Sequence, residues 1–145
     1  MNSQTILGFD VGSHKIGVAV GESLLGRATP LKRLMVHQGL LPLDEIKKLI
    51  QQWRPTVLVV GMPTHMDGRR QFTTDMALAF IDFLKQHTNI PIYPVDERLT
   101  TKTARSELFE QGGFKKLSNA DVDSYAAKLI IESWMNERSL DEAQE

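Results

Sequence analysis

The chain has 145 residues, of which 41% are hydrophobic and 24% are charged. A chain of this length buries roughly 70% of the surface that its unfolded form exposes, which predicts one domain with a substantial core. It contains no cysteine, which excludes disulfides, thiolate metal sites and a cysteine nucleophile, so any bound metal must have oxygen or histidine ligands.

Charge and hydropathy narrow the class further. No apolar run approaches the ~20 residues that span a bilayer, and the first residues lack a basic, apolar leader, so we expect a cytoplasmic protein without membrane contact. The net charge is −1, from 17 basic and 18 acidic residues. Three of the acids lie in residues 139–145, which we interpret as a flexible polar tail after a single domain over 1–138. Without this tail basic residues are in excess, so the charge permits a nucleic-acid partner.

The first half of the chain reads as strands followed by a helix. Two short β-rich runs, 6–10 and 16–20, flank a glycine-containing turn and predict a hairpin. A third strand is expected over 27–35, although Pro30 weakens it, and the apolar spacing over 43–53 predicts an amphipathic helix that ends before Pro55. The continuous β-branched run over 56–61 is typical of a strand covered on both faces, and we expect it to be the central strand.

The second half alternates helices with one further strand. A turn-rich loop over 61–70 precedes a helix that ends at Asn89, and the strand over 90–95 contains two prolines, which favour a sheet edge. Helices are then expected from Thr100 or Thr101 to about Gln111, and from Ser118 or Asn119 to about Arg138. The order predicts an α/β fold: a mixed five-stranded sheet, with a three-stranded antiparallel start, then βαβ units, and helices on both faces.

Three acidic residues fall at matching positions in this scheme. Asp10 and Glu97 follow apolar strands, where sites in such sheets gather, and Asp123 lies on the last helix. At 100° per residue, Asp123 shares the apolar face with Ala127 and its neighbours, whereas Asp121 shares the opposite face with Ser124, Tyr125 and Lys128. Asp123 is therefore the carboxylate expected to approach the two strand ends.

Three close carboxylates would repel one another unless divalent ions bound between them. Mg²⁺ or Mn²⁺ fits, because these ions prefer oxygen ligands and take substrate phosphates as further ligands. The pattern predicts a two-metal phosphodiester hydrolase with Asp10, Glu97 and Asp123 as metal ligands and catalytic residues. The alternative from spacing alone is that each acid accepts local hydrogen bonds or forms a surface ion pair.

Basic residues near these acids are candidates for nucleic-acid binding. Arg98, Lys102 and Arg105 form a helical stripe that begins next to Glu97, and we interpret it as a track for phosphates. The alternative is a solvated helix face paired with nearby glutamates. Arg69 and Arg70, in the loop after the fourth strand, could extend the same surface. Trp53 and Trp134 lie on apolar helix stripes, which favours a place in the core.

Four segments of the sequence, in order, carry a family resemblance. FDVGSHKIGVAV at 9–20, VVGMPTHMDG at 59–68, DERLTT at 96–101 and VDSYAA at 122–127 resemble the motifs of the bacterial YqgF family. The resemblance covers about residues 5–136. It implies a ribonuclease H-like fold and a nuclease site formed by Asp10, Glu97 and Asp123. The family often has Lys-Arg where this chain has His14 and Lys15, so Lys15 would contact phosphate as a point charge rather than a fork.

The family is described as Holliday-junction-resolvase-like and as processing pre-16S ribosomal RNA. The resemblance therefore implies an endonuclease for structured nucleic acid, with the 5′ end of pre-16S rRNA favoured over branched DNA and with a possible association with the ribosome or its precursor. We expect a monomer or weak homodimer. The competing interpretations are a non-catalytic assembly factor and, because Asp-x-Gly hairpins also occur there, an actin-like ATPase.

Overall fold

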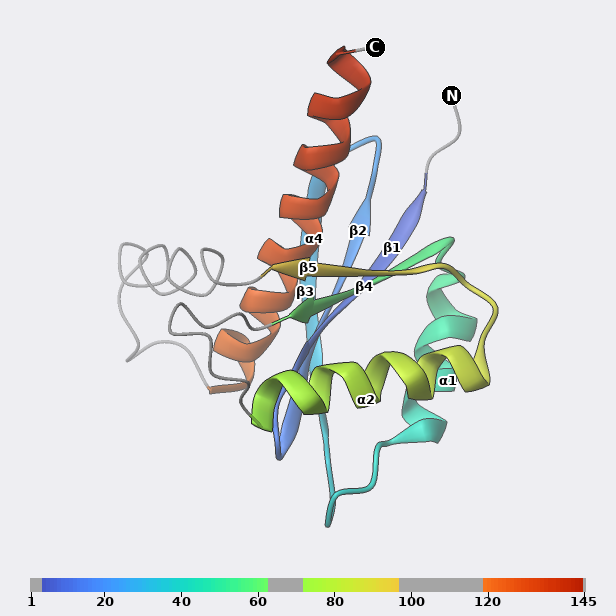
Figure 1. Ribbon diagram of the computed structural model, residues 1–145, viewed down its shortest axis with the longest axis vertical. Coiled ribbons are helices and arrows are strands. Elements are labelled where there is room, and N and C mark those ends of the chain that lie inside the picture. Colours follow the sequence, from blue (N-terminus) through green and yellow to red (C-terminus); the bar gives the residue numbers. More distant parts are fainter. Residues whose placement is uncertain (1–3, 63–71, 97–118, 145) are drawn as a thin grey trace.

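A five-stranded mixed sheet forms the middle layer of the molecule (Figure 1). The computed structural model describes residues 4–62, 72–96 and 119–144. The strands are β1 (Thr5–Val11), β2 (Lys15–Glu22), β3 (Arg27–Met35), β4 (Val57–Met62) and β5 (Ile92–Asp96). Their order across the sheet is β3-β2-β1-β4-β5, with β1–β2 and β2–β3 antiparallel, and β1–β4 and β4–β5 parallel.

This order confirms the predicted antiparallel start and the parallel continuation, with one correction. The run that begins at Val57 is an interior strand whose residues are almost all buried, but the middle strand of the sheet is β1. Continuous burial requires a neighbour on each side and cover on both faces, and any interior strand meets those conditions. The proline-containing β5 is an edge strand, as expected.

Three helices are described: α1 (Leu43–Trp53), α2 (Phe72–His87) and α4 (Asn119–Gln144). The first closes with Arg54 in the left-handed conformation, whose N–H bonds to the carbonyl of Ile50 at 2.8 Å. The last continues six residues beyond the expected end at Arg138. No glycine or proline interrupts that segment. The helix expected over 100–111 lies outside the described residues.

The two faces of the sheet carry separate cores, because side chains alternate along each strand. Odd residues of β1, such as Leu7 and Phe9, face α1 and α2, where the rings of Phe9 and Phe80 lie 5.1 Å apart. Even residues, such as Ile6, face α4 and pack with Ile130 and Ile131. The predicted helices on both faces are therefore confirmed.

Helix α4 lies very close to the sheet because glycines face it. A Cβ atom built on Gly8 would clash with the side chain of Ile131 and lie 3.2 Å from the carbonyl oxygen of Ala127. A Cβ atom on Gly21 would lie 2.6 Å from Cγ2 of Ile131. Glycine in β1 and β2 and alanine in α4 thus let the two backbones approach to a distance that larger side chains would prevent.

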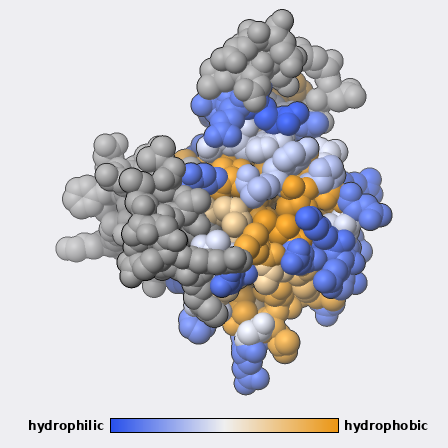
Figure 2. All heavy atoms as spheres, viewed as in Figure 1, coloured by the Kyte–Doolittle hydropathy of each residue, from blue (hydrophilic) through white to orange (hydrophobic). Residues whose placement is uncertain are grey.

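Figure 2 shows apolar residues gathered in the middle of the face seen in Figure 1, with polar residues around them. Among the described residues, the exposed large apolar side chains include Leu78 and Tyr93, each 38% exposed. No helix within the described ranges is long and apolar enough to cross a membrane.

Candidate functional site

Asp10 lies at the carboxyl end of the middle strand, on the face that α4 covers. It pairs with Gly17 of β2, and it follows Phe9, which pairs with Val60 of β4. Because Gly8 faces α4, the alternation along β1 directs Asp10 to the same face. Its side chain is partly buried. The sequence prediction that Asp10 marks a strand end next to the last helix is consistent with this geometry.

The start of α4 lies at the same end of the sheet as Asp10. Ser124 contacts Val18, which pairs with Phe9, whereas Ile131, two turns later, lies against Gly8 and Gly21. The helix therefore runs antiparallel to β1, and its earlier residues approach the carboxyl end of that strand. The backbone of Asp123 is helical and immediately precedes Ser124. The backbone of Asp123 therefore lies toward the end of β1 that carries Asp10.

Ser124 is buried, although its helical phase predicted otherwise. It was grouped with Tyr125 and Lys128 on the outer face, but only 1% of it is exposed. Its hydroxyl donates to the carbonyl oxygen of Leu31 at 2.6 Å and accepts from the N–H of Val18 at 3.4 Å. A buried hydroxyl with both partners satisfied is a fixed contact between α4 and the sheet.

The strands have an irregularity where this serine binds. Ile16 pairs with Leu34 and Val18 pairs with Leu31, so two residues of β3, Lys32 and Arg33, lie opposite the single Gly17 of β2. This is a β-bulge, which disrupts the ladder and redirects side chains. The Ser124 hydroxyl joins the two strands beside the bulge. No periodicity in the sequence signals a bulge, which is why the burial of Ser124 was not foreseen.

A second polar contact joins α4 to β3 two turns later. The N–H of Ala28 donates to Oε2 of Glu132 at 3.0 Å, and Nζ of Lys128 lies 3.2 Å from Oε1 of the same carboxylate. Both charged side chains are about one quarter exposed. The edge strand β3 is therefore held to α4 at two points, of which Ser124 is the nearer to Asp10.

The parallel half of the sheet ends beside Asp10. Gly61 pairs with Val95, so Asp10, Gly61 and Val95 lie in one row across β1, β4 and β5. Two strand spacings, about 9–10 Å, separate the first and last of them. Val95 is buried against the α4 core, and Asp96, the last residue of β5, is exposed. Because side chains alternate along a strand, Asp96 points to the opposite face of the sheet from Val95.

Several predicted residues cannot be placed. Glu97, which follows β5 in the sequence, lies outside the described residues, as do the candidate basic residues Arg69, Arg70, Arg98, Lys102 and Arg105. Of the predicted nucleic-acid contacts, only Lys15 is described. It begins β2, and its carbonyl oxygen accepts the N–H of Gly12 at 2.9 Å. Lys15 thus lies in the hairpin that follows Asp10.

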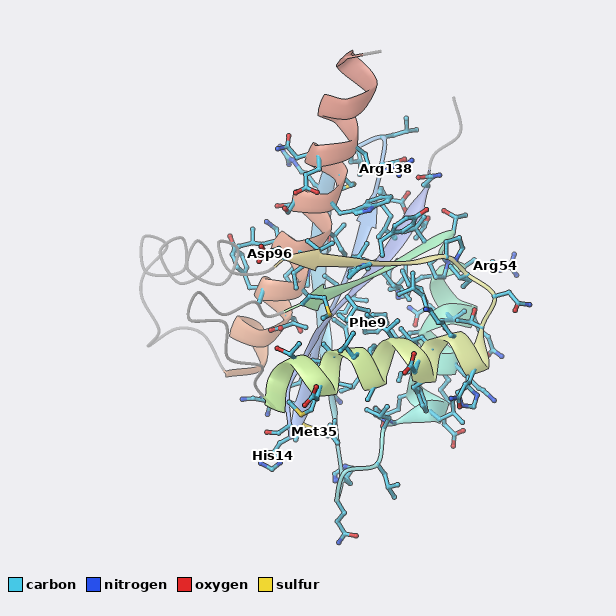
Figure 3. All side chains as sticks on the ribbon, in the orientation of Figure 1. Phe9, His14, Met35, Arg54, Asp96 and Arg138 are labelled. Atoms are coloured by element: carbon cyan, nitrogen blue, oxygen red, sulfur yellow. The ribbon has the colours of Figure 1, made fainter. Side chains whose placement is uncertain are left out.

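The end of β3 also reaches this hairpin. Lys15 pairs with Met35, and the N–H of Val36 donates to the carbonyl oxygen of His14 at 2.8 Å. Figure 3 shows His14 and Met35 together at one end of the sheet, far from Arg54 and Arg138. The carboxyl ends of β1 and β3 and the start of α4 therefore share one edge of the molecule.

The predicted ligand set is suited to a hard divalent cation, since its donors are carboxylate oxygens. Within the described part of the chain, no group of three or more His, Asp or Glu is arranged to hold a metal ion. Of the three predicted ligands, only Asp10 has a described side chain. Its position on the α4 face, with the backbone of Asp123 nearby, is compatible with the predicted set.

Comparison with known proteins decides the family. The family model for RuvX, described as a Holliday junction resolvase, matches residues 4–137. The chain belongs to the RuvX family. It is the same family as YqgF, which the four sequence motifs resemble. A protein of Aeromonas salmonicida named "Putative pre-16S rRNA nuclease" is 44% identical over 95% of this chain and 99% of its own. A protein of the same name from Shewanella oneidensis is 46% identical over 92% and 95%.

Solved structures of distant sequence share the fold. RuvC of Thermus thermophilus, in complex with a Holliday junction substrate, matches with a TM-score of 0.57 at 17% identity, over 94% of this chain and 96% of that one. The fowlpox virus Holliday junction resolvase matches with a TM-score of 0.59 at 10% identity, over 92% and 99%. The RuvX-family chain is thus an α/β protein of the ribonuclease H-like fold, as expected.

Proposed function

We propose that this chain is a Mg²⁺- or Mn²⁺-dependent endonuclease that cleaves structured nucleic acid at a site formed by Asp10, Glu97 and Asp123. The 5′ end of pre-16S rRNA is the favoured substrate. The relatives named for this activity align over nearly their whole length, which supports the assignment. A cytoplasmic location, association with the ribosome or its precursor, and a monomeric or weakly dimeric state remain predictions from the sequence.

One observation carries the proposal. The chain places Asp10 at the carboxyl end of the middle strand on the α4 face, and α4 runs antiparallel to that strand, so its first turns approach the same end. The proposed convergence of Asp10, Glu97 and Asp123 at one sheet edge fits a cation site, because close carboxylates repel one another unless a cation binds between them.

Divalent ions bound there would lower the pKa of a water nucleophile and stabilise the leaving oxygen of the phosphodiester. The contribution of the chain is to orient carboxylate oxygens. Asp10 is on the most central strand, and the helix that carries Asp123 is held to the sheet by Ser124. We assign to Lys15, in the hairpin after Asp10, a contact with a substrate phosphate.

The direct test is cleavage by matched variants. Asp10→Asn and Asp123→Asn are expected to lower kcat by more than about 100-fold, because they remove ligand charge with little change of shape, while melting temperatures stay close to that of the wild type. Asp96→Asn is the matched control, since this exposed aspartate lies next in sequence to Glu97. Its activity should be retained, and chelation by EDTA should abolish cleavage in every active variant.

The substrate panel separates two candidate functions. Pre-16S rRNA leader fragments are expected to be cut faster than four-way DNA junctions. The description of the family and the shared fold favour junction DNA as the second candidate. Faster cleavage of the junction would transfer the assignment to a resolvase. Cleavage that persists in both aspartate variants would refute the proposed site, and binding without any cleavage would indicate a non-catalytic assembly factor.

A further inference from the structure

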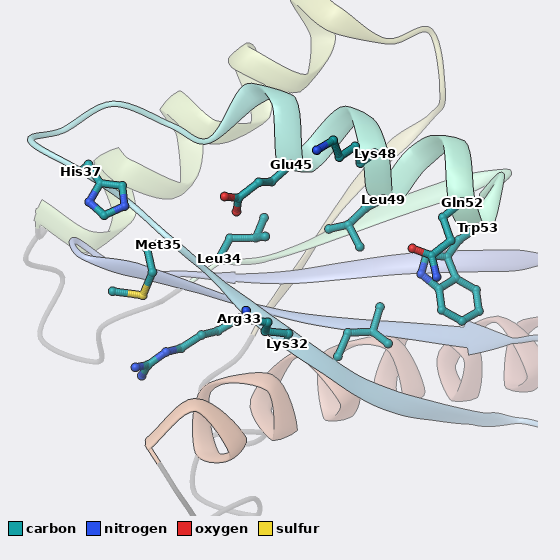
Figure 4. A pocket seen from close by; sticks show the side chains of 11 residues that line it. Lys32, Arg33, Leu34, Met35, His37, Glu45, Lys48, Leu49, Gln52 and Trp53 are labelled. Carbon is teal, nitrogen blue, oxygen red and sulfur yellow. The ribbon is translucent and has the colours of Figure 1, made fainter.

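A surface groove lies between β3 and α1, on the opposite face of the sheet from α4. Its volume is about 450 Å³. The strand side is formed by residues 31–35 and His37, and the helix side by Glu45, Lys48, Leu49, Gln52 and Trp53. Figure 4 shows these two rows facing each other, with His37 and Met35 at one end and Gln52 and Trp53 at the other.

The groove begins at the same end of the sheet as the proposed nuclease site, but it lies on the α1 face whereas Asp10 faces α4, so a strand would pass around the β1–β2 hairpin to reach both. Met35 pairs with Lys15, and Val36 bonds to His14, in the hairpin that follows Asp10. From Met35 the groove follows β3 back to Leu31, a distance of about 13 Å at ~3.3 Å per residue. The groove therefore extends away from the proposed site over a length that a few nucleotides of single-stranded nucleic acid would span.

The lining combines an apolar floor with basic margins. Leu31 and Leu34 belong to the core on the α1 face, and Trp53 packs against that core but is only partly buried. Lys32 and Lys48 are both exposed, one on each wall. Glu45 is the acid among the lining residues, and Arg33 points away from α1 in Figure 4.

This combination fits one class of ligand. Single-stranded nucleic acid is bound by aromatic side chains that stack on bases and by cations that follow the backbone. A duplex is too wide for a cavity of this volume, which lies in the lower part of the ~300–1,000 Å³ range of small-molecule pockets. The bulge at Lys32 and Arg33 interrupts the edge strand, which disfavours the addition of a peptide strand there.

We propose that the β3–α1 groove binds an unpaired stretch of the substrate strand next to the cleavage site, with a base against Trp53 and phosphates near Lys32 and Lys48. The inference rests on the proposed nuclease function for the identity of the substrate. Binding in the groove does not require cleavage, so the two are tested separately in the Asp10→Asn background.

The chain contains two tryptophans, and this provides a specific readout. Trp134 is buried in the α4 core, so in Trp134→Phe the remaining tryptophan fluorescence reports on Trp53. Titration of Asp10→Asn/Trp134→Phe with a short oligouridylate should quench this fluorescence saturably. A blunt RNA duplex of the same length should not. Absence of quenching at concentrations where binding is seen by anisotropy would overturn the proposal.

Substitutions then test the two kinds of contact. Trp53→Ala is expected to weaken oligouridylate binding about 5- to 150-fold, the value of one stacked base. Because this change also removes core contacts, Lys48→Glu and Lys32→Glu serve as surface variants, and each should weaken binding and lower the slope of log K against log salt. Lys47→Ala, an exposed neighbour outside the groove, is the matched control and should bind normally.

Cleavage distinguishes failure of the groove from failure of the nuclease assignment. In the active protein, Lys48→Glu should raise KM for a substrate with an unpaired flank and leave a flankless substrate unchanged. If Lys48→Glu changed KM for the two substrates by the same factor, or for neither, the groove proposal would be rejected and the nuclease site would be unaffected. If Asp10→Asn cut normally, the nuclease site would fail, while fluorescence would still report on the groove.

Discussion

At the scale of single residues, Ser124 has the clearest structural role in the candidate site. Its hydroxyl connects α4 to two neighbouring strands beside a β-bulge, and it is adjacent in sequence to Asp123. A hydrogen bond at this point fixes both the rotation of the helix and its position along its axis. A change in either would displace the neighbouring residues of α4, including Asp123.

We predict that Ser124→Ala affects both stability and catalysis. Loss of the hydroxyl leaves the Leu31 carbonyl without this donor, and a buried unsatisfied group costs about 1–3 kcal/mol. Urea denaturation measures this loss. Because a displacement of ~1 Å can cost up to about 100-fold in rate, kcat should fall with little change in KM.

The matched control uses the other contact between α4 and β3. Glu132→Ala removes the bond to the N–H of Ala28, which lies farther from Asp10. A similar loss of stability without a fall in kcat is expected. If both variants lowered kcat equally, the effect of Ser124 would be one of general stability and its positioning role would be rejected.

Local periodicity leads to the three acids as predictions, but it does not lead to Ser124, which anchors α4 to the sheet. Asp10 follows from a strand pattern, and Asp123 from helical phase, because both depend on local periodicity. Ser124 was assigned to the outer face by the same rule. A helix can bury a polar side chain where the sheet offers unpaired backbone groups, and those groups arise from strand pairing between distant segments, which periodicity does not report.

At the scale of elements, the approach of α4 to β1 and β2 depends on small residues on both sides. The side chain of Ile131 packs against Gly8 and Gly21, and the backbone carbonyl of Ala127 lies next to Gly8. The separation between helix and sheet determines how near α4 brings Asp123 to the strand ends. On this view, contacts between α4 and the sheet at residues other than the acids would set the distance between Asp10 and Asp123.

Gly8→Ala is predicted to destabilise the fold by about 1–3 kcal/mol through overpacking against Ile131. Ile131→Ala should cost about 2–5 kcal/mol on its own by leaving a cavity. In the double variant the new methyl group occupies part of that cavity, so the combined loss should be smaller than the sum. Denaturant titration of all four proteins measures the coupling, and strict additivity would contradict the proposed contact.

The type of each element was more predictable from the sequence than the residue at which it ends or its position in the sheet. The described strands lie where β-rich apolar runs predicted them and the described helices where apolar spacing predicted them, and the edge position of β5 followed from its prolines. The middle position of β1 was missed, because β1 and β4 are both interior strands in which most residues are buried. The extension of α4 to Gln144 was also missed, since a polar composition was taken as a sign of irregular structure.

At the scale of the whole molecule, the net charge of −1 requires that any attraction to nucleic acid be local. The predicted track of Arg98, Lys102 and Arg105 would supply such a local charge. Removal of one phosphate contact is expected to lower the slope of log K against log salt by about 0.9 for a duplex or ~0.7 for a single strand. We predict this change for Arg98→Ala and for Lys102→Ala, measured by fluorescence anisotropy across a salt series.

Metal binding provides the internal comparison for these variants. Arg98→Ala and Lys102→Ala should keep the Mn²⁺ dependence of residual cleavage, because positively charged side chains do not coordinate a metal ion. Lys47→Ala, on the exposed face of α1, should leave the salt slope unchanged. A slope that stayed the same in the first two variants would reject the basic track and favour a solvated helix face.

The position of α4 at the end of the described chain has a consequence for synthesis. All five strands lie within residues 5–96, yet the face that bears Asp10 is covered by a helix that begins at Asn119. While a nascent chain lacks that helix, the apolar side of its sheet, including Ile6 and Val59, has no partner and the two aspartates cannot meet. On the proposed function, a nascent chain would therefore acquire nuclease activity only after α4 has left the ribosome and packed against the sheet.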